Sequence, residues 1–181
     1  MQKFNIAKEE IKREFMKKFK KTSMATIVIC LLILILYVIV AAIYMENTKA
    51  VLIGTVSLIG FLLLPIVLII NLSFYKNGVV KMKKMPMEIV VAEDAIMIDG
   101  IAYTYESIRQ IRVTPPSYAM ASFGKNAAHR EMTVVDKNNK KTSFFMGFRH
   151  PEKMIFKEYE ALCTVLKKQF MNHPEKFIYE L

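Results

Sequence analysis

Two long apolar segments separated by four residues constrain this chain more than any other feature. Residues 24–45 contain thirteen Leu, Ile or Val, residues 50–75 contain seventeen Leu, Ile, Val or Phe, and neither segment carries a charge. About 20 apolar residues span the hydrocarbon core of a bilayer as a helix, and lipid offers the backbone no hydrogen-bond partner. The sequence therefore predicts a transmembrane helical hairpin over 24–75, with helices at about 24–45 and 50–75.

Charge on the two sides of this hairpin sets its predicted orientation. Residues 1–23 carry eight Lys or Arg against three Glu, and basic residues resume after the second segment at Lys76, Lys81, Lys83 and Lys84. Since basic residues stay on the cytoplasmic side of a membrane, we expect a two-span protein of the cell membrane with both termini in the cytoplasm. A cleaved signal peptide is the competing interpretation, but the long basic start and the second apolar segment argue against it.

The basic residues also bear on partners. The chain has 181 residues, a formal net charge of +10 and no nucleic-acid-binding motif, so we expect membrane lipid rather than nucleic acid to meet these charges. Residues 1–23 are predicted to form a basic amphipathic helix that lies in the headgroup layer or continues into the first span. Its apolar side would carry Phe4, Ile11, Phe15 and Phe19. The candidate contacts to anionic lipid are Lys17, Lys18, Lys20, Lys21, Lys81, Lys83 and Lys84.

The rest of the chain is predicted to be a juxtamembrane linker at 76–86 and a cytoplasmic domain at 87–181. Its clearest signal is the pair Asp99-Gly100 between two alternating apolar runs, which is typical of a tight β-hairpin. Pairing across that turn puts Ile98 opposite Ile101 and Ile96 opposite Tyr103. We expect one face of this hairpin to be core, with these four side chains and Tyr105 on it.

Further strands and one helix follow the first hairpin. We expect a strand at 108–113, a long loop at 114–130, a second hairpin at 131–146 with Asp136 opposite Lys141, and an amphipathic helix at about 151–171. Five to seven short antiparallel strands closed by one helix make a small α+β domain. The predicted fold class is an α+β membrane protein, with an N-terminal transmembrane helical hairpin and this small domain.

The order of these elements suggests a family. The pattern begins with a strand and the Asp-Gly hairpin, whose second strand is IAYTY (101–105). The run Tyr105-Glu106-Ser107-Ile108 then leads into an Ile-Arg-Val strand, and a late hairpin and a closing helix follow. Over residues 87–171 this pattern resembles the bacterial pleckstrin-homology-like (PH-like) domains that follow a pair of transmembrane helices in small Gram-positive membrane proteins. The resemblance implies a PH-like fold that serves binding or scaffolding at the membrane. It does not imply the eukaryotic phosphoinositide pocket, because no matching basic strand-loop motif is present.

Residues that could perform chemistry are few and scattered. His129, His150 and His173 have no second ligand at a metal-binding spacing, and no phosphate loop or nucleophile motif occurs. Cys30 lies in the first apolar segment and Cys163 in the last predicted helix, so we expect no disulfide. The sequence thus predicts a protein that is not an enzyme and that has no catalytic residues, cofactor or metal.

One segment remains as a candidate contact surface for a partner. The long loop would expose apolar groups beside basic ones, and long loops on a rigid scaffold often bind partners. Its candidate contact residues for a protein or lipid are Tyr118, Met120, Phe123, Lys125 and Arg130.

Our functional hypothesis is a membrane-anchored, non-enzymatic protein that presents a PH-like binding or scaffold domain at the cytoplasmic face of the membrane and has a protein partner. One alternative is an immunity protein against a membrane-active toxin or bacteriocin. A second alternative is a small oligomeric pore, since two such helices could form a pore only as a homo-oligomer.

Overall fold

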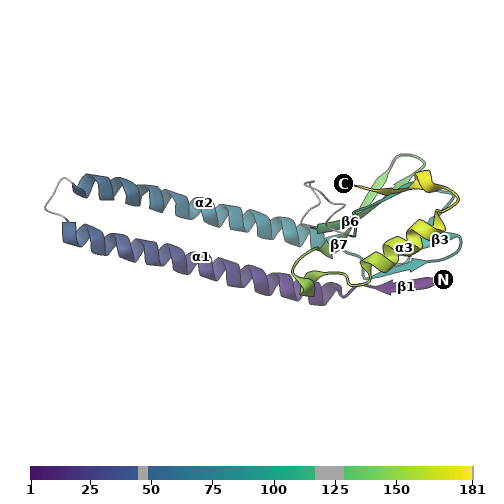
Figure 1. Ribbon diagram of the computed structural model, residues 1–181, viewed down its shortest axis with the longest axis horizontal. Helices are drawn as coiled ribbons and strands as arrows, with labels where there is room; N and C mark the ends of the chain where they lie inside the picture. The colour runs from purple at the N-terminus through teal and green to yellow at the C-terminus, as the bar shows by residue number, and fades with distance from the viewer. Residues whose placement is uncertain (45–48, 117–128, 181) are drawn as a thin grey trace. The chain divides into compact units, whose positions relative to one another are not determined.

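The computed structural model describes residues 1–44, 49–116 and 129–180, with their side chains except at 36, 37 and 40–64. Its elements, in chain order, are β1 (Gln2–Asn5), α1 (Lys8–Tyr44), α2 (Lys49–Lys83), β2 (Glu88–Val91), β3 (Ala95–Ile98), β4 (Ile101–Thr104), β5 (Ile108–Val113), β6 (His129–Asp136), β7 (Lys141–Phe148), η2 (Glu152–Met154), α3 (Tyr159–Gln169), η3 (Pro174–Lys176) and β8 (Phe177–Tyr179) (Figure 1).

The chain forms two compact units. The first, called the β-rich unit below, combines Met1–Phe15 with Val80–Leu181, and the second, called the helical unit, is Met16–Val79. In sequence, the helical unit is therefore an insertion within the β-rich unit.

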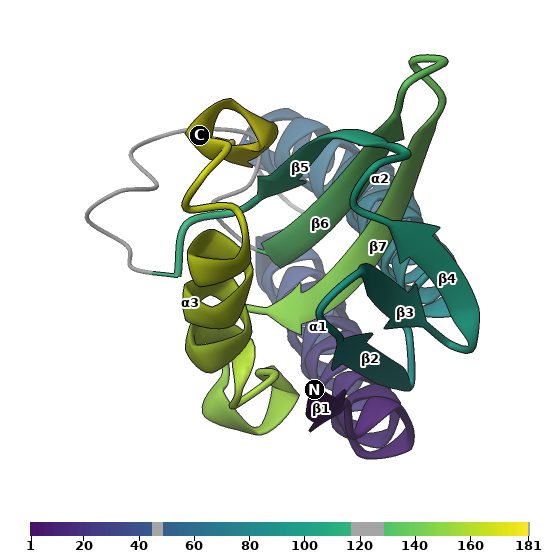
Figure 2. The same ribbon diagram turned by 90° about the vertical axis from the view of Figure 1, so that its right-hand side faces the viewer.

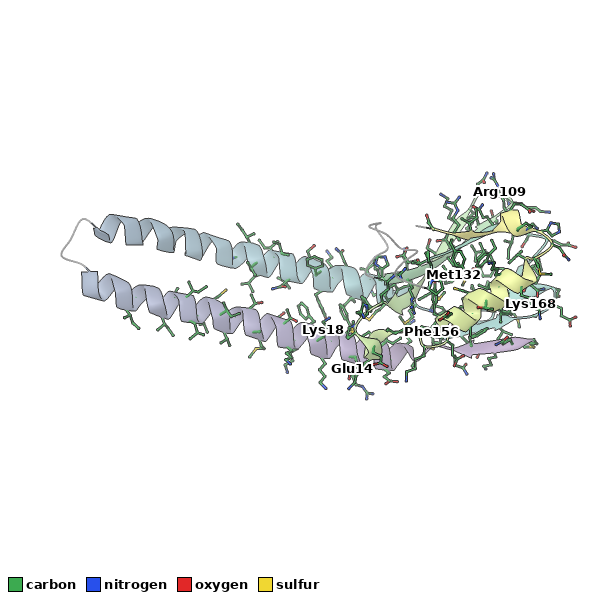
Figure 3. The ribbon with its side chains drawn as sticks, in the orientation of Figure 1. Glu14, Lys18, Arg109, Met132, Phe156 and Lys168 are labelled. Atoms are coloured by element: carbon green, nitrogen blue, oxygen red, sulfur yellow. The ribbon has the colours of Figure 1, made fainter. Side chains whose placement is uncertain are left out.

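The β-rich unit contains two four-stranded sheets, with strand orders β1-β2-β3-β4 and β7-β6-β5-β8. Neighbouring strands are antiparallel except β5 and β8, which are parallel. Figure 2 shows these strands with α3 beside them. Apolar side chains from both sheets and from α3 fill the core, including Ile96, Ile111 and Leu166, each at most 1% exposed. Met132 and Phe156, labelled in Figure 3, are buried there as well.

The Asp-Gly hairpin is present as predicted. Ile98 pairs with Ile101 and Ile96 with Tyr103, and both turn residues have positive φ, 49° at Asp99 and 80° at Gly100, as a two-residue hairpin requires. The predicted core face is only half right, because Ile96 and Ile98 are buried but Ile101 is 61% exposed. The reason is that β4 lies at the edge of its sheet.

The strand at 108–113 is also as predicted, and the second hairpin differs by one residue in register. Lys141 pairs with Val135 rather than with Asp136. The Asp136 carboxylate instead accepts a hydrogen bond from the backbone N–H of Lys140 at 2.8 Å and so closes the turn.

The predicted N-terminal helix over 1–23 is wrong at its start, where residues form strand β1. Phe4 lies opposite Ile89 of β2 and is 1% exposed, so pairing with β2 and burial of the aromatic ring outweigh helix propensity. The predicted aromatic stripe packs within the protein. Phe15 stacks on Phe148 with ring centroids 5.4 Å apart.

The predicted helix at 151–171 is divided into η2 and α3. The break occurs because Ile155 adopts an extended conformation and forms an antiparallel bridge with Gly147 of β7. From Tyr159 onward the prediction of an amphipathic helix is correct, since Tyr159, Leu162, Leu166 and Phe170 are all buried.

The predicted linker at 76–86 is largely helix, because α2 continues to Lys83. Its last turn is packed rather than extended, with Met82 4% exposed. The domain boundary expected at 87 therefore lies earlier, and the domain also includes residues 1–15.

In the helical unit, α1 and α2 contact each other through Phe19 and Tyr75, whose ring centroids are 4.3 Å apart. Many of their described apolar side chains are exposed, among them Leu32 at 60%, Ile69 at 65% and Phe74 at 71%.

Among the residues that the structure describes, no helix has an apolar stretch long enough to cross a membrane. This finding contradicts the prediction of a transmembrane hairpin at 24–75 and of an α+β membrane protein. It also contradicts the prediction of an integral membrane protein with lipid as a partner, located with two spans in the cell membrane and both termini in the cytoplasm. We withdraw these predictions.

Candidate functional site

Arg130 is the one predicted loop contact that lies among the described residues, and the structure places it at the start of β6. It is half-buried rather than freely exposed. Its guanidinium carbon lies 4.8 Å from the centre of the Tyr159 ring, and its Nη2 donates a hydrogen bond to the carbonyl of Pro116 at 3.2 Å. A guanidinium over an aromatic ring is held in orientation by a cation–π contact. Arg130 is therefore fixed on α3 at the base of the predicted loop.

A second guanidinium, that of Arg149, acts on Arg130. Arg149 is 3% exposed, and its Nη2 donates a hydrogen bond to the carbonyl of Pro115 at 2.8 Å. Burial lowers the pKa of Arg130, and the positive charge of Arg149 lowers it further, while Tyr159 opposes the shift. Arg130 and Arg149 thus donate to the carbonyls of two consecutive prolines, and we call them the arginine pair.

Tyr159, whose ring Arg130 contacts, and the nearby Cys163 are both buried residues of α3. The hydroxyl of Tyr159 donates to the carbonyl of Thr114 at 2.7 Å, and burial raises the pKa of Tyr159 well above its ordinary value. Burial also raises the pKa of the neighbouring Cys163 thiol to about 12, which makes it a poor nucleophile at neutral pH. These groups therefore position Arg130 and carry no reactive centre.

Three further charged or titratable side chains lie together near the start of β6. The Nζ of Lys81 is 2.6 Å from Nε2 of His129, and the same Nε2 is 3.0 Å from a carboxylate oxygen of Glu131. Lys81 and Glu131 are themselves 3.5 Å apart. The pKa of Glu131 is lowered mainly by its hydrogen bond with His129, with Lys81 adding to the effect and burial opposing it. This cluster ties the last turns of α2 to β6.

The other predicted contact residues are placed as follows. Tyr118, Met120, Phe123 and Lys125 lie outside the described residues. The predicted lysines divide between the units: the exposed Lys17, Lys18, Lys20 and Lys21 belong to the helical unit, and Lys81, Lys83 and Lys84 to the β-rich unit. Lys83 and Lys84 are exposed, whereas Lys81 belongs to the cluster with His129. The withdrawn prediction concerned a membrane-spanning protein; contact of these individual lysines with anionic lipid headgroups is a separate prediction that the structure does not test.

The sequence did not indicate Arg149, Tyr159, His129 or Glu131 as functional, and it indicated Lys81 only as a contact to anionic lipid. The partners in these contacts are 19 to 50 residues apart, except within β6, so no local motif marks them. The only signal of a partner contact was Arg130 itself, a basic residue at the boundary between a predicted loop and a strand.

Metal ligands do not converge in the part of the chain that the structure describes, where no group of three His, Cys, Asp or Glu could hold an ion. The arginine pair can supply positive charge and directional N–H donors, and this is the chemistry of binding an anionic group rather than of bond breaking. Comparison with known proteins adds no family, since no family model, no curated protein and no solved structure matches this chain.

Proposed function

We propose that this is a non-enzymatic binding protein whose β-rich unit engages a protein partner through the surface around Arg130. The observation that carries the proposal is that the Arg130 side chain is held in place within the protein without an ion-pair partner among the described residues. Arg130 is fixed over Tyr159, yet in the described ranges its Nε has no hydrogen-bond partner and no carboxylate forms an ion pair with it. The Nε itself is buried, so the feature suited to contact another molecule is the partly exposed Arg130 side chain, whose charge no described carboxylate pairs.

Residue type supports a protein as that molecule. Arg and Tyr are enriched among the residues that carry most of the binding energy at protein interfaces, because a planar cation and a rigid ring give large contact area with little loss of conformational freedom. The PH-like resemblance, which is an expectation from sequence, agrees with a binding or scaffold role. Membrane anchoring forms no part of the proposal.

The test is capture of the partner in cells by crosslinking at native expression, followed by mass spectrometry. We expect one defined partner to be captured by the unmodified chain, to be lost with Arg130→Gln and to be retained with Arg109→Gln. Arg109 is a matched control because it is an exposed Arg at the start of β5 (Figure 3) whose charge is removed in the same way.

A third variant separates charge from shape. Arg130→Lys keeps the positive charge but loses the planar guanidinium that stacks on Tyr159, so we expect reduced rather than normal capture. Full capture by Arg130→Gln would contradict the proposal.

A further inference from the structure

Lys81 and His129 approach each other more closely than two positive charges tolerate. Nζ of Lys81 lies 2.6 Å from Nε2 of His129 and 3.3 Å from Nδ1 of the same ring. A histidine ring with one protonated nitrogen is neutral, whereas a ring with both nitrogens protonated is a cation. Like charges at such distances repel strongly, so the observed arrangement requires a neutral ring.

Glu131 favours the charged form of the same ring. One of its carboxylate oxygens lies 3.0 Å from Nε2 of His129, and the two residues are two apart in β6, a spacing that puts side chains on one face of a strand. The pKa of Glu131 is lowered, first of all by its hydrogen bond with His129. The carboxylate is therefore an acceptor between about pH 5 and pH 8, where histidine takes up a proton.

The end of α2 that carries Lys81 is anchored independently of this contact. Met82, the next residue, is 4% exposed, and the carbonyl of Lys84 accepts a hydrogen bond from the backbone N–H of Phe145 in β7 at 3.1 Å. The Lys81 side chain is 36% exposed. Its ammonium can therefore move into water while the helix stays in place.

The groups around His129 leave the choice to Lys81 and Glu131. Among the described residues, Lys81 from α2 and Glu131 from β6 are the charged groups that face the ring. The element β7 contributes the uncharged ring of Phe145, with centroids 6.1 Å apart. Glu131 is nearer to the ring than to Lys81, at 3.0 Å against 3.5 Å, so a charged ring keeps the carboxylate.

We propose that the Lys81–His129–Glu131 cluster is a pH-sensitive switch in which protonation of His129 expels the Lys81 ammonium and leaves the ring paired with Glu131. The proton comes from water and adds to the unprotonated ring nitrogen, and no other covalent bond changes. The charged ring then donates to the carboxylate in a charge-assisted hydrogen bond. This inference concerns α2 and β6 and does not depend on the proposed partner of Arg130.

The switch changes the charge presented at the end of α2. With a neutral ring, the charges of Lys81 and Glu131 cancel within the cluster. After protonation the cluster has a net positive charge, and Lys81 extends into water in the same part of the chain as the exposed Lys83 and Lys84. Acidification therefore makes this surface more basic, as in other switches that are driven by histidine protonation.

The test is an NMR comparison of the full chain at about pH 8 and about pH 5, on either side of the range in which histidine changes charge. The readout is the nuclear Overhauser contact between the Cε protons of Lys81 and the ring protons of His129. We expect this contact at the higher pH and its loss at the lower pH. The contact between the rings of His129 and Phe145 should persist at both.

Two variants assign the loss to charge and to this histidine. Lys81→Met keeps an unbranched side chain without the charge, so we expect the contact of the replacing side chain with the His129 ring at both pH values. His173→Gln is the matched histidine control, because His173 is exposed and pairs with Glu175, and it should leave the pH-dependent loss of the Lys81 contact unchanged.

Three outcomes would overturn the switch. The first is a Lys81 contact of equal strength at both pH values in the unmodified chain, which needs no variant to fold. The second is loss of the contact with Phe145 as well, which would indicate local unfolding. The third is the same pH-dependent loss in Lys81→Met, which would show that charge repulsion does not cause it.

Discussion

At the scale of single residues, Glu131 connects the stability of the β-rich unit to pH. Its pKa is lowered in the folded chain from an ordinary 4.5, so its ionised form stabilises the fold fully above that value. This contribution is lost as the pH falls through the lower, folded pKa. We expect thermal unfolding between about pH 7 and about pH 3 to show a smaller acid-induced drop in Tm for Glu131→Gln than for the unmodified chain.

The matched control for this measurement is Glu106→Gln, which removes an exposed carboxylate in the turn before β5. It should leave the acid-induced drop in Tm as it is in the unmodified chain. An equal drop in Glu131→Gln and the unmodified chain would show that the cluster with Lys81 and His129 does not link protonation to folding.

Among the residues of the site, the sequence indicated Lys81 as a lipid contact and Arg130 as a partner contact. Arg130 was recognisable because it follows a stretch without periodicity and begins a run of strand-forming residues. Arg149 fell between the predicted hairpin at 131–146 and the predicted helix at 151–171 with no motif around it, and Tyr159 fitted the apolar side of that helix. Their approach to Arg130 depends on how sheet and helix pack, and packing over such sequence separations leaves no local pattern.

At the scale of elements, the close approach of Gly147 in β7 to the segment after η2 explains why the predicted C-terminal helix is broken at Ile155. The φ of Gly147 is +96°, and a Cβ there would lie 3.2 Å from the carbonyl oxygen of Met154 and 3.3 Å from the backbone N of Phe156. Gly147→Ala should therefore lower the free energy of unfolding by more than the roughly 1–2 kcal/mol of a left-handed alanine alone.

Gly100 provides the comparison for that measurement by chemical denaturation. It has φ +80° but nothing within 4 Å of an added Cβ, so Gly100→Ala should cost only the backbone strain of about 1–2 kcal/mol. Equal losses in the two variants would mean that the close approach of β7 to the segment after η2 has no energetic weight.

Strand β1 gives a second prediction at this scale. Phe4 is buried against β2, and Phe4→Ala should cost about 3–5 kcal/mol of unfolding free energy through lost burial and a cavity. Lys3→Ala removes only an exposed ion pair with Glu88 at 2.6 Å and should change stability by about 1 kcal/mol or less. A small effect of Phe4→Ala, comparable to that of Lys3→Ala, would contradict the docking of β1.

The elements that could be predicted from sequence are those made by neighbours in the chain. The hairpin at Asp99 and Gly100 and the strand at 108–113 depend on local turn chemistry and alternation, and both are correct. Strand β1 and the break at Ile155 were missed, since each depends on a backbone partner in another element. For α1 and α2, composition predicted helix correctly. It did not establish the environment of these helices.

At the scale of the whole molecule, the β-rich unit is discontinuous, and this predicts which fragments fold. A chain in which 16–79 is replaced by a flexible Gly-Ser linker keeps β1, Phe4 and Ile11 and should give a dispersed amide NMR spectrum with cooperative melting. A fragment of residues 82–181 lacks β1 and should melt at a lower temperature or lose cooperativity. Equal melting of the two would show that residues 1–15 are dispensable for the unit.

The pairing of β1 with β2 also has a consequence for synthesis in the cell. Phe4 is translated before its partner Ile89, which follows 85 residues later, as the difference between 89 and 4 shows. At about 5–20 residues per second the ribosome needs about 4–17 seconds to cover that distance. Throughout this interval strand β1 has no sheet to join, so its residues reach their native places only after β2 has been made.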